Sequence, residues 1–588
     1  MTRRRAGLGA AAAAVAVLLS GCGGLSGAGP VEPGLEVGSG EQAALGIVFP
    51  GPVDGDSRED IVNGFLRAGA ASNGAYDNAR KFLTVQAAER WNPDSTIVLR
   101  ADDATPTTTL TDPAHVTVTA AAAGTVGPDS RFTPAPPGAK VSATFDLTSI
   151  SGQWRISGMP EGFGRWIAQR DVSRLVQPFD VNYISTSRQA TVPDVRWFPL
   201  DKLATRLARA QLTPVPDHLI GAATTAVPQG SRLLGDAVSL DSGTATVNLV
   251  AGRAGPGEQT RQNMWAQFVS TLSQDPSVSR VELAINGTPV DLVGLTGPAT
   301  SLADIGFPPP VEPTSAHPVV RRGAEVTVFN PTDAAPQTVQ PTPGADRYPP
   351  VTPEFTRLAL SPDGAELAGV DPDGAGISRW RGTTRYEVPG FGSAVGNPSY
   401  DSRGYLWVGG IGNAANRLFV IDVGADPADA RAAAATPVRA DWLAGRRVLE
   451  SRVALDGDRV AVLSTGRNGG DVRIDLAGVV RGGGGRPERL SPPLRLGVTV
   501  TDAVGLTWVD DTDVATIAAV GGGTRRPTVL SVGGDVRPLE PVEGAVAITT
   551  TAGERNLYVV TSTGRLLGLN GTQWADSGRA TDLAVPAG

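Results

Sequence analysis

A repeat of short strands fills the C-terminal half of the chain. Its unit is a strand, a turn rich in Asp and Gly, a second strand, a Gly-rich turn and a third strand. The first turns of the five units fall near residues 364, 404, 457, 511 and 554, so they lie 40, 53, 54 and 43 residues apart. A period of about 40 to 50 residues with this unit is typical of β-propeller blades. A β-sandwich is the alternative, but it gives no reason for the turn to recur at this spacing.

The two ends of the repeat region predict how the ring closes. Residues 581–588 echo the start of the first unit, residues 356–364, so the chain ends after the first strand of another blade. Residues 319–320 and 325–329 precede the first full unit and supply candidate strands for the same blade. Joining both ends in one blade removes the open sheet edges of a ring. We therefore predict an all-β propeller over residues 317–588 with six blades, of which one is composite.

The N-terminus has the features of an exported lipoprotein. Three arginines precede an Ala-rich apolar run, residues 6–19, which is shorter than the ~18 to 20 residues that span a bilayer but has the length of a signal-peptide core. The run ends in Leu-Ser-Gly-Cys at residues 19–22, which resembles the bacterial lipobox. We predict a signal peptide at residues 1–21, cleavage between Gly21 and Cys22, and a lipid on Cys22. The alternative is an ordinary signal peptide with an incidental cysteine, but Cys22 is the single cysteine of 588 residues, which rules out a structural disulfide within the chain.

Residues 22–178 are predicted to form a tether and a first domain. Residues 22–50 are rich in Gly, Ser and Pro and favour a flexible tether. Residues 51–178 begin with two helical stretches, the first with Ser57 as N-cap and the second running from Tyr76 to about Trp91. Strand-like segments follow at residues 96–100, 115–120, 140–150 and 153–157. Helices followed by an antiparallel sheet predict an α+β domain, and the order is similar to the NTF2-like fold.

Residues 181–300 are predicted to form a second α+β domain. A long helix places Met264, Phe268 and Leu272 on one face, and Asn286-Gly287 is a strong hairpin dipeptide. The order of a Pro-Gln-Gly turn at residues 228–230, a strand, this helix and a second strand ending in Asn-Gly resembles the GerMN domain, a module named from spore germination and sporulation proteins. Residues 301–316 are Pro-rich and predict a semi-rigid linker to the propeller.

Composition and motifs give little support to catalysis. The net charge of −8 and the pI near 5.2 offer no basic footprint for nucleic acid. The three histidines, His115, His218 and His317, fall in three different predicted domains, which disfavours a zinc site. Residues 410–415 match a dinucleotide fingerprint but lead into a strand instead of a helix, and the Asp-rich turns at residues 371–374 and 510–513 lack the remaining ligands of a calcium loop. We therefore predict no catalytic residue, no metal site and no cofactor.

The whole arrangement resembles one family. Lipobox, α+β domain, GerMN-like domain and propeller occur in the order of the actinobacterial LpqB lipoproteins, and the most specific pieces are Leu-Ser-Gly-Cys and Ile-Val-x-Gly-Phe-Leu-x-Ala at residues 61–68. The resemblance implies a non-enzymatic lipoprotein on the outer face of the cell membrane. Its implied partner is the extracytoplasmic domain of a sensor histidine kinase of the MtrA–MtrB two-component type, and its implied role lies in cell-wall homeostasis, division and morphology.

Two alternatives to the kinase-binding hypothesis remain. One is a protein that binds cell-wall glycan. The other is a propeller enzyme with a site in the central channel, which would need several carboxylates, histidines or arginines converging on one face. From the residues themselves, we expect a membrane-tethered binding protein.

Overall fold

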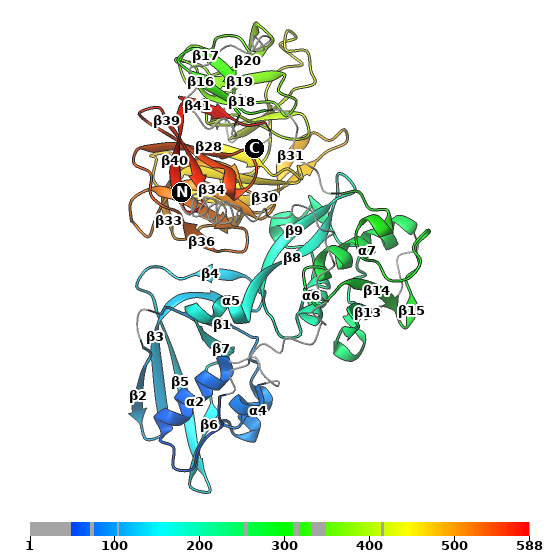
Figure 1. Cartoon of the computed structure of the whole chain (residues 1–588), viewed down its shortest axis with the longest axis vertical. Coiled ribbons are helices and arrows are strands. Elements are labelled where there is room, and N and C mark those ends of the chain that lie inside the picture. Colours follow the sequence, from blue (N-terminus) through cyan, green and yellow to red (C-terminus); the bar gives the residue numbers. More distant parts are fainter. Residues whose placement is uncertain are drawn as a thin grey trace, which may run out of the picture. The chain divides into compact units, whose positions relative to one another are not determined.

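The computed structural model describes residues 49–70, 76–102, 105–251, 257–309, 317–330, 348–412 and 417–586. Gly21 and Cys22 lie outside these residues, so cleavage and lipidation stay predictions. Within the described residues, no helix combines the length and the apolar character that a bilayer crossing requires. The described chain runs through an α+β domain, a second α+β domain and a ring of small sheets, which Figure 1 colours from blue to red.

The first helix begins where the sequence predicts. In α2 (Arg58–Ala70), the backbone N–H of Asp60 donates to Oγ of Ser57 at 3.1 Å, and the Ser57 hydroxyl donates to the Asp60 carboxylate at 2.7 Å. The second helical stretch differs from the prediction, because it splits into α3 (Asp77–Arg80) and α4 (Val85–Arg90). Between them, Leu83 forms a β-bridge with Ile156, so the chain leaves the helix to pair with the sheet.

The first domain packs these helices on an antiparallel sheet, as predicted for an α+β domain. The strand order is β6-β5-β3-β1-β7, with β2 and β4 paired to β3, and only β1 and β7 run parallel. Its strands are β1 (Ile97–Arg100), β2 (Thr107–Asp112), β3 (His115–Val126), β4 (Phe132–Pro134), β5 (Lys140–Ile150), β6 (Gln153–Gly158) and β7 (Arg165–Ala168). Phe65, Trp91 and Phe145 lie in the core between sheet and helices. The narrower likeness to the NTF2-like fold stays a prediction.

The second domain has two small sheets around one long helix. After the short helix α5 (Val172–Leu175), the first sheet has the order β10-β8-β9 and the second has β11-β13-β14-β15 with β12 on β13. The elements are β8 (Val176–Ser185), β9 (Thr191–Pro199), α6 (Leu203–Gln211), β10 (Ala223–Thr224), β11 (Arg232–Leu233), β12 (Ser239–Asp241), β13 (Thr244–Val250), α7 (Glu258–Leu272), β14 (Arg280–Ile285) and β15 (Thr288–Pro289).

The core of the second domain follows the predicted pattern and extends beyond it. Met264, Phe268 and Leu272 of α7 are buried, and the Asn286-Gly287 turn has positive φ at both residues, as a tight hairpin requires. Ile305 and Phe307 also lie in this core, although the sequence placed them in the linker. The rest of the linker, residues 310–316, lies outside the described residues.

The C-terminal ring consists of six blades, as predicted. Five are continuous sheets with the orders β18-β19-β20-β21, β23-β24-β26-β27, β28-β29-β30-β31, β33-β34-β35-β36 and β37-β38-β39-β40. Each innermost strand comes first in its blade: β18 (Thr356–Leu360), β23 (Ser399–Tyr400), β28 (Arg446–Val453), β33 (Val500–Trp508) and β37 (Ala545–Thr550). The second strands are β19 (Glu366–Val370), β24 (Tyr405–Gly409), β29 (Arg459–Gly466), β34 (Asp513–Val520) and β38 (Leu557–Thr561).

The outer strands complete the five continuous blades. The third strands are β20 (Ile377–Arg381), β26 (Leu418–Asp422), β30 (Arg473–Arg481), β35 (Arg526–Ser531) and β39 (Arg565–Asn570). The outermost are β21 (Thr384–Glu387), β27 (Thr436–Pro437), β31 (Pro487–Leu490), with β32 (Leu494–Leu496) also on β30, β36 (Val536–Pro538) and β40 (Gln573–Arg579). A two-stranded ribbon pairs β22 (Gly392–Ser393), which precedes the second blade in sequence, with β25 (Ile411–Gly412), which lies between its strands β24 and β26.

The sixth blade confirms the predicted composite closure. It has the order β17-β16-β41, where β16 (Val319–Arg322) and β17 (Glu325–Val328) come from the start of the region and β41 (Asp582–Ala584) comes from its end. Val320 of β16 pairs with Leu583 of β41 in antiparallel register. The C-terminal strand is thus the innermost strand of this blade, and the ring has no unpaired end.

Candidate functional site: the propeller channel

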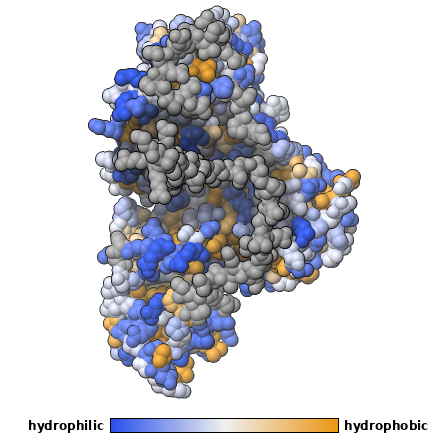
Figure 2. Space-filling model, viewed as in Figure 1, coloured by the Kyte–Doolittle hydropathy of each residue, from blue (hydrophilic) through white to orange (hydrophobic). Residues whose placement is uncertain are grey.

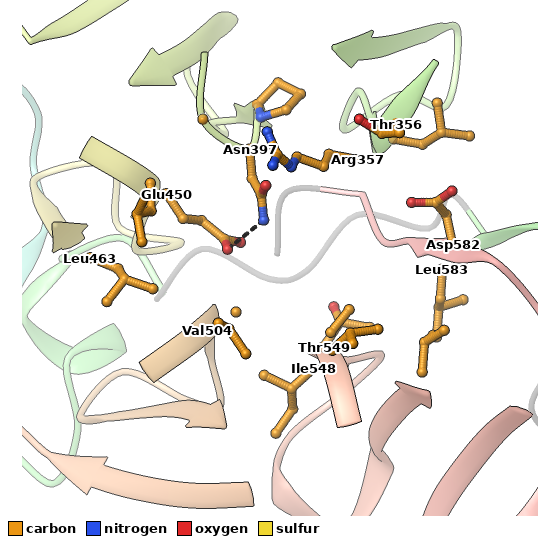
Figure 3. A pocket seen from close by; sticks show the side chains of 18 of the residues that line it. Thr356, Arg357, Asn397, Glu450, Leu463, Val504, Ile548, Thr549, Asp582 and Leu583 are labelled. Atoms are coloured by element: carbon orange, nitrogen blue, oxygen red, sulfur yellow. Dashed lines mark hydrogen bonds between the residues drawn. The ribbon is translucent and has the colours of Figure 1, made fainter. Parts of the chain in front are cut away.

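The innermost strands of the blades enclose a cavity of about 390 Å³. All six blades supply lining residues, so the cavity is the central channel of the ring, and Figure 3 shows their side chains around a common space. One part of the wall is apolar and includes Leu463, Val504, Ile548 and Leu583. The remaining wall carries charged side chains, which makes the channel the best candidate site within the described residues.

Bulges in four inner strands shape this wall. The register of β18 shifts at Arg357 and Leu358, that of β28 at Leu449, that of β33 at Gly505 and that of β37 at Val546. Each of these residues lines the cavity. A bulge bends its strand and re-aims a side chain, and bulges are frequent at barrel rims and beside functional sites. The channel wall is therefore built from locally irregular backbone.

Two carboxylates in the channel are already paired. Asp582 of β41 forms an ion pair with Arg321 of β16. Glu450 of β28 lies 2.7 Å from Nη2 of Arg452, and Nδ2 of Asn397 donates to Glu450 at 2.7 Å. Figure 3 shows this last bond as a dashed line. Both acidic side chains thus have partners from the protein.

Two arginines in the channel are held differently. Nη1 of Arg357 donates to the carbonyl of Val395 at 2.9 Å, and Nε of Arg447 donates to the carbonyl of Ala394 at 3.3 Å. Among the described residues, no carboxylate forms an ion pair with either guanidinium. The two side chains come from different blades but meet consecutive carbonyls of one loop, so their charges lie close together.

Burial and neighbouring charges shift the pKa values of Asp582 and Arg357, two of the channel's charged side chains. Burial raises the pKa of Asp582, although the charge of Arg321 opposes the shift. Burial, followed by the charge of Arg447, lowers the pKa of Arg357. An arginine stays protonated at neutral pH in either case, so the shift at Arg357 indicates an unfavourable surrounding for positive charge rather than a change of state.

The residues that the sequence singled out do not gather into one site. His115 contacts Asp112 and Asp146 in the first domain, and Nε2 of His218 lies 3.4 Å from Asp194 in the second. The fingerprint at residues 410–415 continues into strand β26, and its residues 413–415 lie outside the described chain. Within the described residues, no three His, Cys, Asp or Glu side chains are placed to hold a metal ion.

The sequence contained one overlooked signal for the channel. Thr-Arg-Leu-Ala at residues 356–359 and Thr-Asp-Leu-Ala at residues 581–584 are equivalent positions in the repeat. In both motifs the second residue is charged, Arg357 in β18 or Asp582 at the start of β41, and both residues line the cavity. Charged residues that break an otherwise apolar repeat at equivalent positions therefore mark the channel wall.

Comparisons with known proteins agree with this architecture. Family models match residues 51–173 as "Lipoprotein LpqB, N-terminal domain", residues 180–291 as "Sporulation and spore germination", and residues 333–587 as "Lipoprotein LpqB beta-propeller domain". The chain belongs to the LpqB lipoprotein family. It is 27% identical to Lipoprotein LpqB of Thermobifida fusca, with 89% of each chain covered, and 25% identical to that of Streptomyces coelicolor, with 99% of this chain and 98% of the other covered.

Similar solved structures add little to the family assignment. Regucalcin, a calcium-binding protein from Agrobacterium tumefaciens, is 12% identical, covers 40% of this chain and 74% of its own, and has a TM-score of 0.27. Both of these relatives carry the name Lipoprotein LpqB. The predicted GerMN-like module and propeller both coincide with matched models.

Proposed function

We propose that this LpqB-family chain is anchored by a lipid on Cys22 to the outer face of the cell membrane. There it acts as a non-enzymatic accessory protein that binds the extracytoplasmic domain of a sensor histidine kinase of the MtrA–MtrB type. Through that kinase it influences cell-wall homeostasis, division and morphology. Family membership over nearly the whole chain supports the lipoprotein part of this proposal.

The observation that supports the binding role is a set of hydrogen bonds, buried or partly buried, between the second domain and the ring. Nε1 of Trp197 donates to the carbonyl of Gly533 at 2.9 Å, and the Ser187 hydroxyl donates to Asp458 at 2.8 Å. The Ser491 hydroxyl donates to the carbonyl of His218 at 2.6 Å. The residues that the structure describes, from 49 to 586, accordingly belong to one compact unit. A partner that binds one of these two domains therefore binds a unit in which the domains are held together by direct hydrogen bonds.

The predicted tether limits where that partner can be. A flexible chain of ~28 residues has a typical end-to-end distance of about 30 Å, from roughly 5 to 6 Å × √n. The folded body therefore stays near the bilayer, where confinement raises the effective concentration of a membrane-bound partner. A modest affinity for a kinase in the same membrane is then sufficient, whereas a freely diffusing partner gains nothing from the anchor.

The face shown in Figure 2 suits a partner that is recognised by polar contacts. On the face shown in Figure 2, hydrophilic and hydrophobic residues alternate, and the apolar residues that the structure describes form only small groups there. A large obligate interface is usually more apolar than this. The proposal is thus a reversible complex whose strength depends on co-localisation.

In-cell photo-crosslinking tests the proposal. Photoreactive residues are placed at exposed positions of the second domain and the ring, for example Leu240 and Val498, which are 46% exposed each. We expect the sensor kinase to be captured from at least one position when Cys22 is intact and much less when it is replaced. Crosslinks only to cell-wall glycan, or full complementation by an unanchored chain at native abundance, would contradict the proposal.

A further inference from the structure

The channel carries uncompensated positive charge in an acidic protein. Four arginines and two acidic side chains line it: Arg321, Arg357, Arg447, Arg452, Glu450 and Asp582. Two of the arginines are neutralised by the two carboxylates, which leaves the charge of Arg357 and Arg447 unmatched. The chain as a whole has a net charge of −8. A concave site with opposite sign to the rest of the molecule concentrates anions from solution.

The guanidinia of Arg357 and Arg447 donate to consecutive carbonyls of one loop, and the charge of Arg447 acts on Arg357. Each guanidinium has five N–H donors, and the hydrogen bonds to Val395 and Ala394 engage only one nitrogen of each. The two positive charges repel each other, in line with the lowered pKa of Arg357. An anion between them removes this repulsion and accepts the remaining donors in the forked geometry that suits oxyanions.

The backbone at this place is strained in a way that aims the arginines. Arg357 has φ of 59° and Ala394 has φ of 50°, in the left-handed region that favours glycine. Arg357 is one of the two arginines, and the carbonyl of Ala394 accepts the hydrogen bond from the other, Arg447. Non-glycine residues in this region cluster at ligand sites, because the fold maintains an unfavourable backbone where a particular side-chain direction is needed.

We propose that the propeller channel binds a small phosphate monoester, with Arg357 and Arg447 clamping the phosphate and the apolar wall receiving the esterified group. The dianion of a phosphate monoester matches the two unpaired charges, whereas a single carboxylate leaves one of them. The cavity, at about 390 Å³, falls within the ~300 to 1,000 Å³ of small-molecule pockets. This inference goes beyond the kinase partnership and does not depend on it.

The apolar side of the channel indicates what the ligand must carry besides its phosphate. In Figure 3, Ile548, Val504 and Leu463 lie across the space from Arg357, and Thr549 adds a hydroxyl beside them. An ester with a compact, partly apolar group fills this side while its phosphate reaches the arginines. We therefore expect phenyl phosphate to bind more tightly than inorganic phosphate, because only the former contacts both walls.

Isothermal titration calorimetry on residues 23–588 tests the proposal, with phenyl phosphate, inorganic phosphate and acetate as probes. We expect saturable binding of phenyl phosphate with one site per chain, and weaker binding of the other two. Arg357→Gln and Arg447→Gln should each weaken phenyl phosphate about tenfold or more, since each removes a charged hydrogen-bond donor. Arg525→Gln is the matched control, because Arg525 is exposed and pairs with Asp502 outside the channel.

Two measurements keep the outcome decisive if an arginine variant unfolds. Circular dichroism and thermal melting check the fold of each variant. Val546→Trp places a large ring in the channel without changing its charge, because Val546 lies on a bulge and is 48% exposed. We expect this variant to lose phenyl phosphate as well. Absence of saturable binding at millimolar probe, affinities equal to wild type in the folded arginine variants, or acetate binding as tightly as phenyl phosphate would overturn the proposal.

Discussion

Ending the chain after Ala580 should open the propeller, although it removes only eight residues from a terminus. Termini are usually the most dispensable part of a domain. Here, however, the lost segment contains β41, which pairs with β16 at three positions and supplies the innermost strand of the sixth blade. Ala584 of this strand is buried in a cluster with Val319 and Trp380. The truncation therefore removes a structural strand and exposes the edge of β16.

The size of the effect follows from two losses. Arg321 is 4% exposed and loses the carboxylate of Asp582, and leaving one partner of a buried ion pair unpaired costs about 3 to 5 kcal/mol. The ladder between β41 and β16 and the bond from the Thr581 N–H to the Arg321 carbonyl disappear as well, at about 1 kcal/mol for each hydrogen bond. The total of about 5 to 8 kcal/mol is comparable to the whole stability of a typical domain, about 5 to 15 kcal/mol.

Urea unfolding followed by tryptophan fluorescence, with hydrogen exchange of the β16 amides, measures this effect. A chain that ends at Pro586 keeps β41 and serves as the control. In the full-length chain, Asp582→Ala isolates the ion pair and should cost about 3 kcal/mol or more, whereas Asp502→Ala should cost less than about 0.5 kcal/mol because its pair with Arg525 lies at the surface. If the chain ending at Ala580 keeps the urea midpoint and the β16 protection of the control, the closure argument is refuted.

Three further predictions follow from other parts of the molecule. If Cys22 carries the proposed lipid, that lipid supplies nearly all of the membrane affinity. Cys22→Ala should then move the protein from the membrane to the soluble fraction or leave an uncleaved precursor, which fractionation in high salt checks. In helix α2, Gly64→Ala should destabilise the first domain by about 1 to 3 kcal/mol, since the added Cβ would lie 2.4 Å from the Phe82 ring. Gly69→Ala should instead stabilise it by about 0.5 to 1 kcal/mol, because its Cβ would make only ordinary van der Waals contact with Trp91. Thermal melting compares the two variants. Burial lowers the pKa of His218, although Asp194 opposes the shift, so the unfolded chain binds this proton more readily than the folded chain. The neutral, buried imidazole therefore contributes to stability above about pH 6.5, and this contribution is lost as pH falls from there toward the folded pKa. In urea unfolding between pH 8 and pH 5, His218→Gln should make the free energy of unfolding depend less on pH than in wild type.

The ring was predictable because its signal repeats. The alternating strands and the Asp/Gly turns recur five times, so the prediction of a blade does not depend on any single turn. The similarity between residues 356–364 and 581–588 predicted how the ring closes. The split of the second helical stretch was not predictable in the same way. Tyr76, Ala79 and Phe82 have helical spacing, but the bridge between Leu83 and Ile156 joins residues far apart in sequence and overrides local propensity.

The sequence pointed to the central channel as a possible site, but it did not indicate that Arg357 and Arg447 would meet there. Motif searches recognise chemistry that is close in the chain, whereas Arg357 and Arg447 come from different blades and meet only because the ring closes. Both guanidinia are held by backbone carbonyls of one loop. Because every residue has a carbonyl, a sequence pattern cannot indicate such a contact. In the closed ring, two carboxylates pair with two of the four arginines of the channel. The positive charge of the other two arginines distinguishes this wall from a packed interior.

The two proposals place different demands on the same ring. Kinase binding uses the outer surface of a tethered body, and a polar, reversible contact is enough because the tether confines both partners to one membrane. Ligand binding uses the channel, where β41 is both the strand that closes the ring and a wall of the cavity. A ligand that binds the closed ring but not the open one stabilises the closed ring by mass action. Phenyl phosphate should therefore raise the melting temperature of the chain that ends at Pro586 and leave that of the chain that ends at Ala580 unchanged, a result that links closure and binding through one strand.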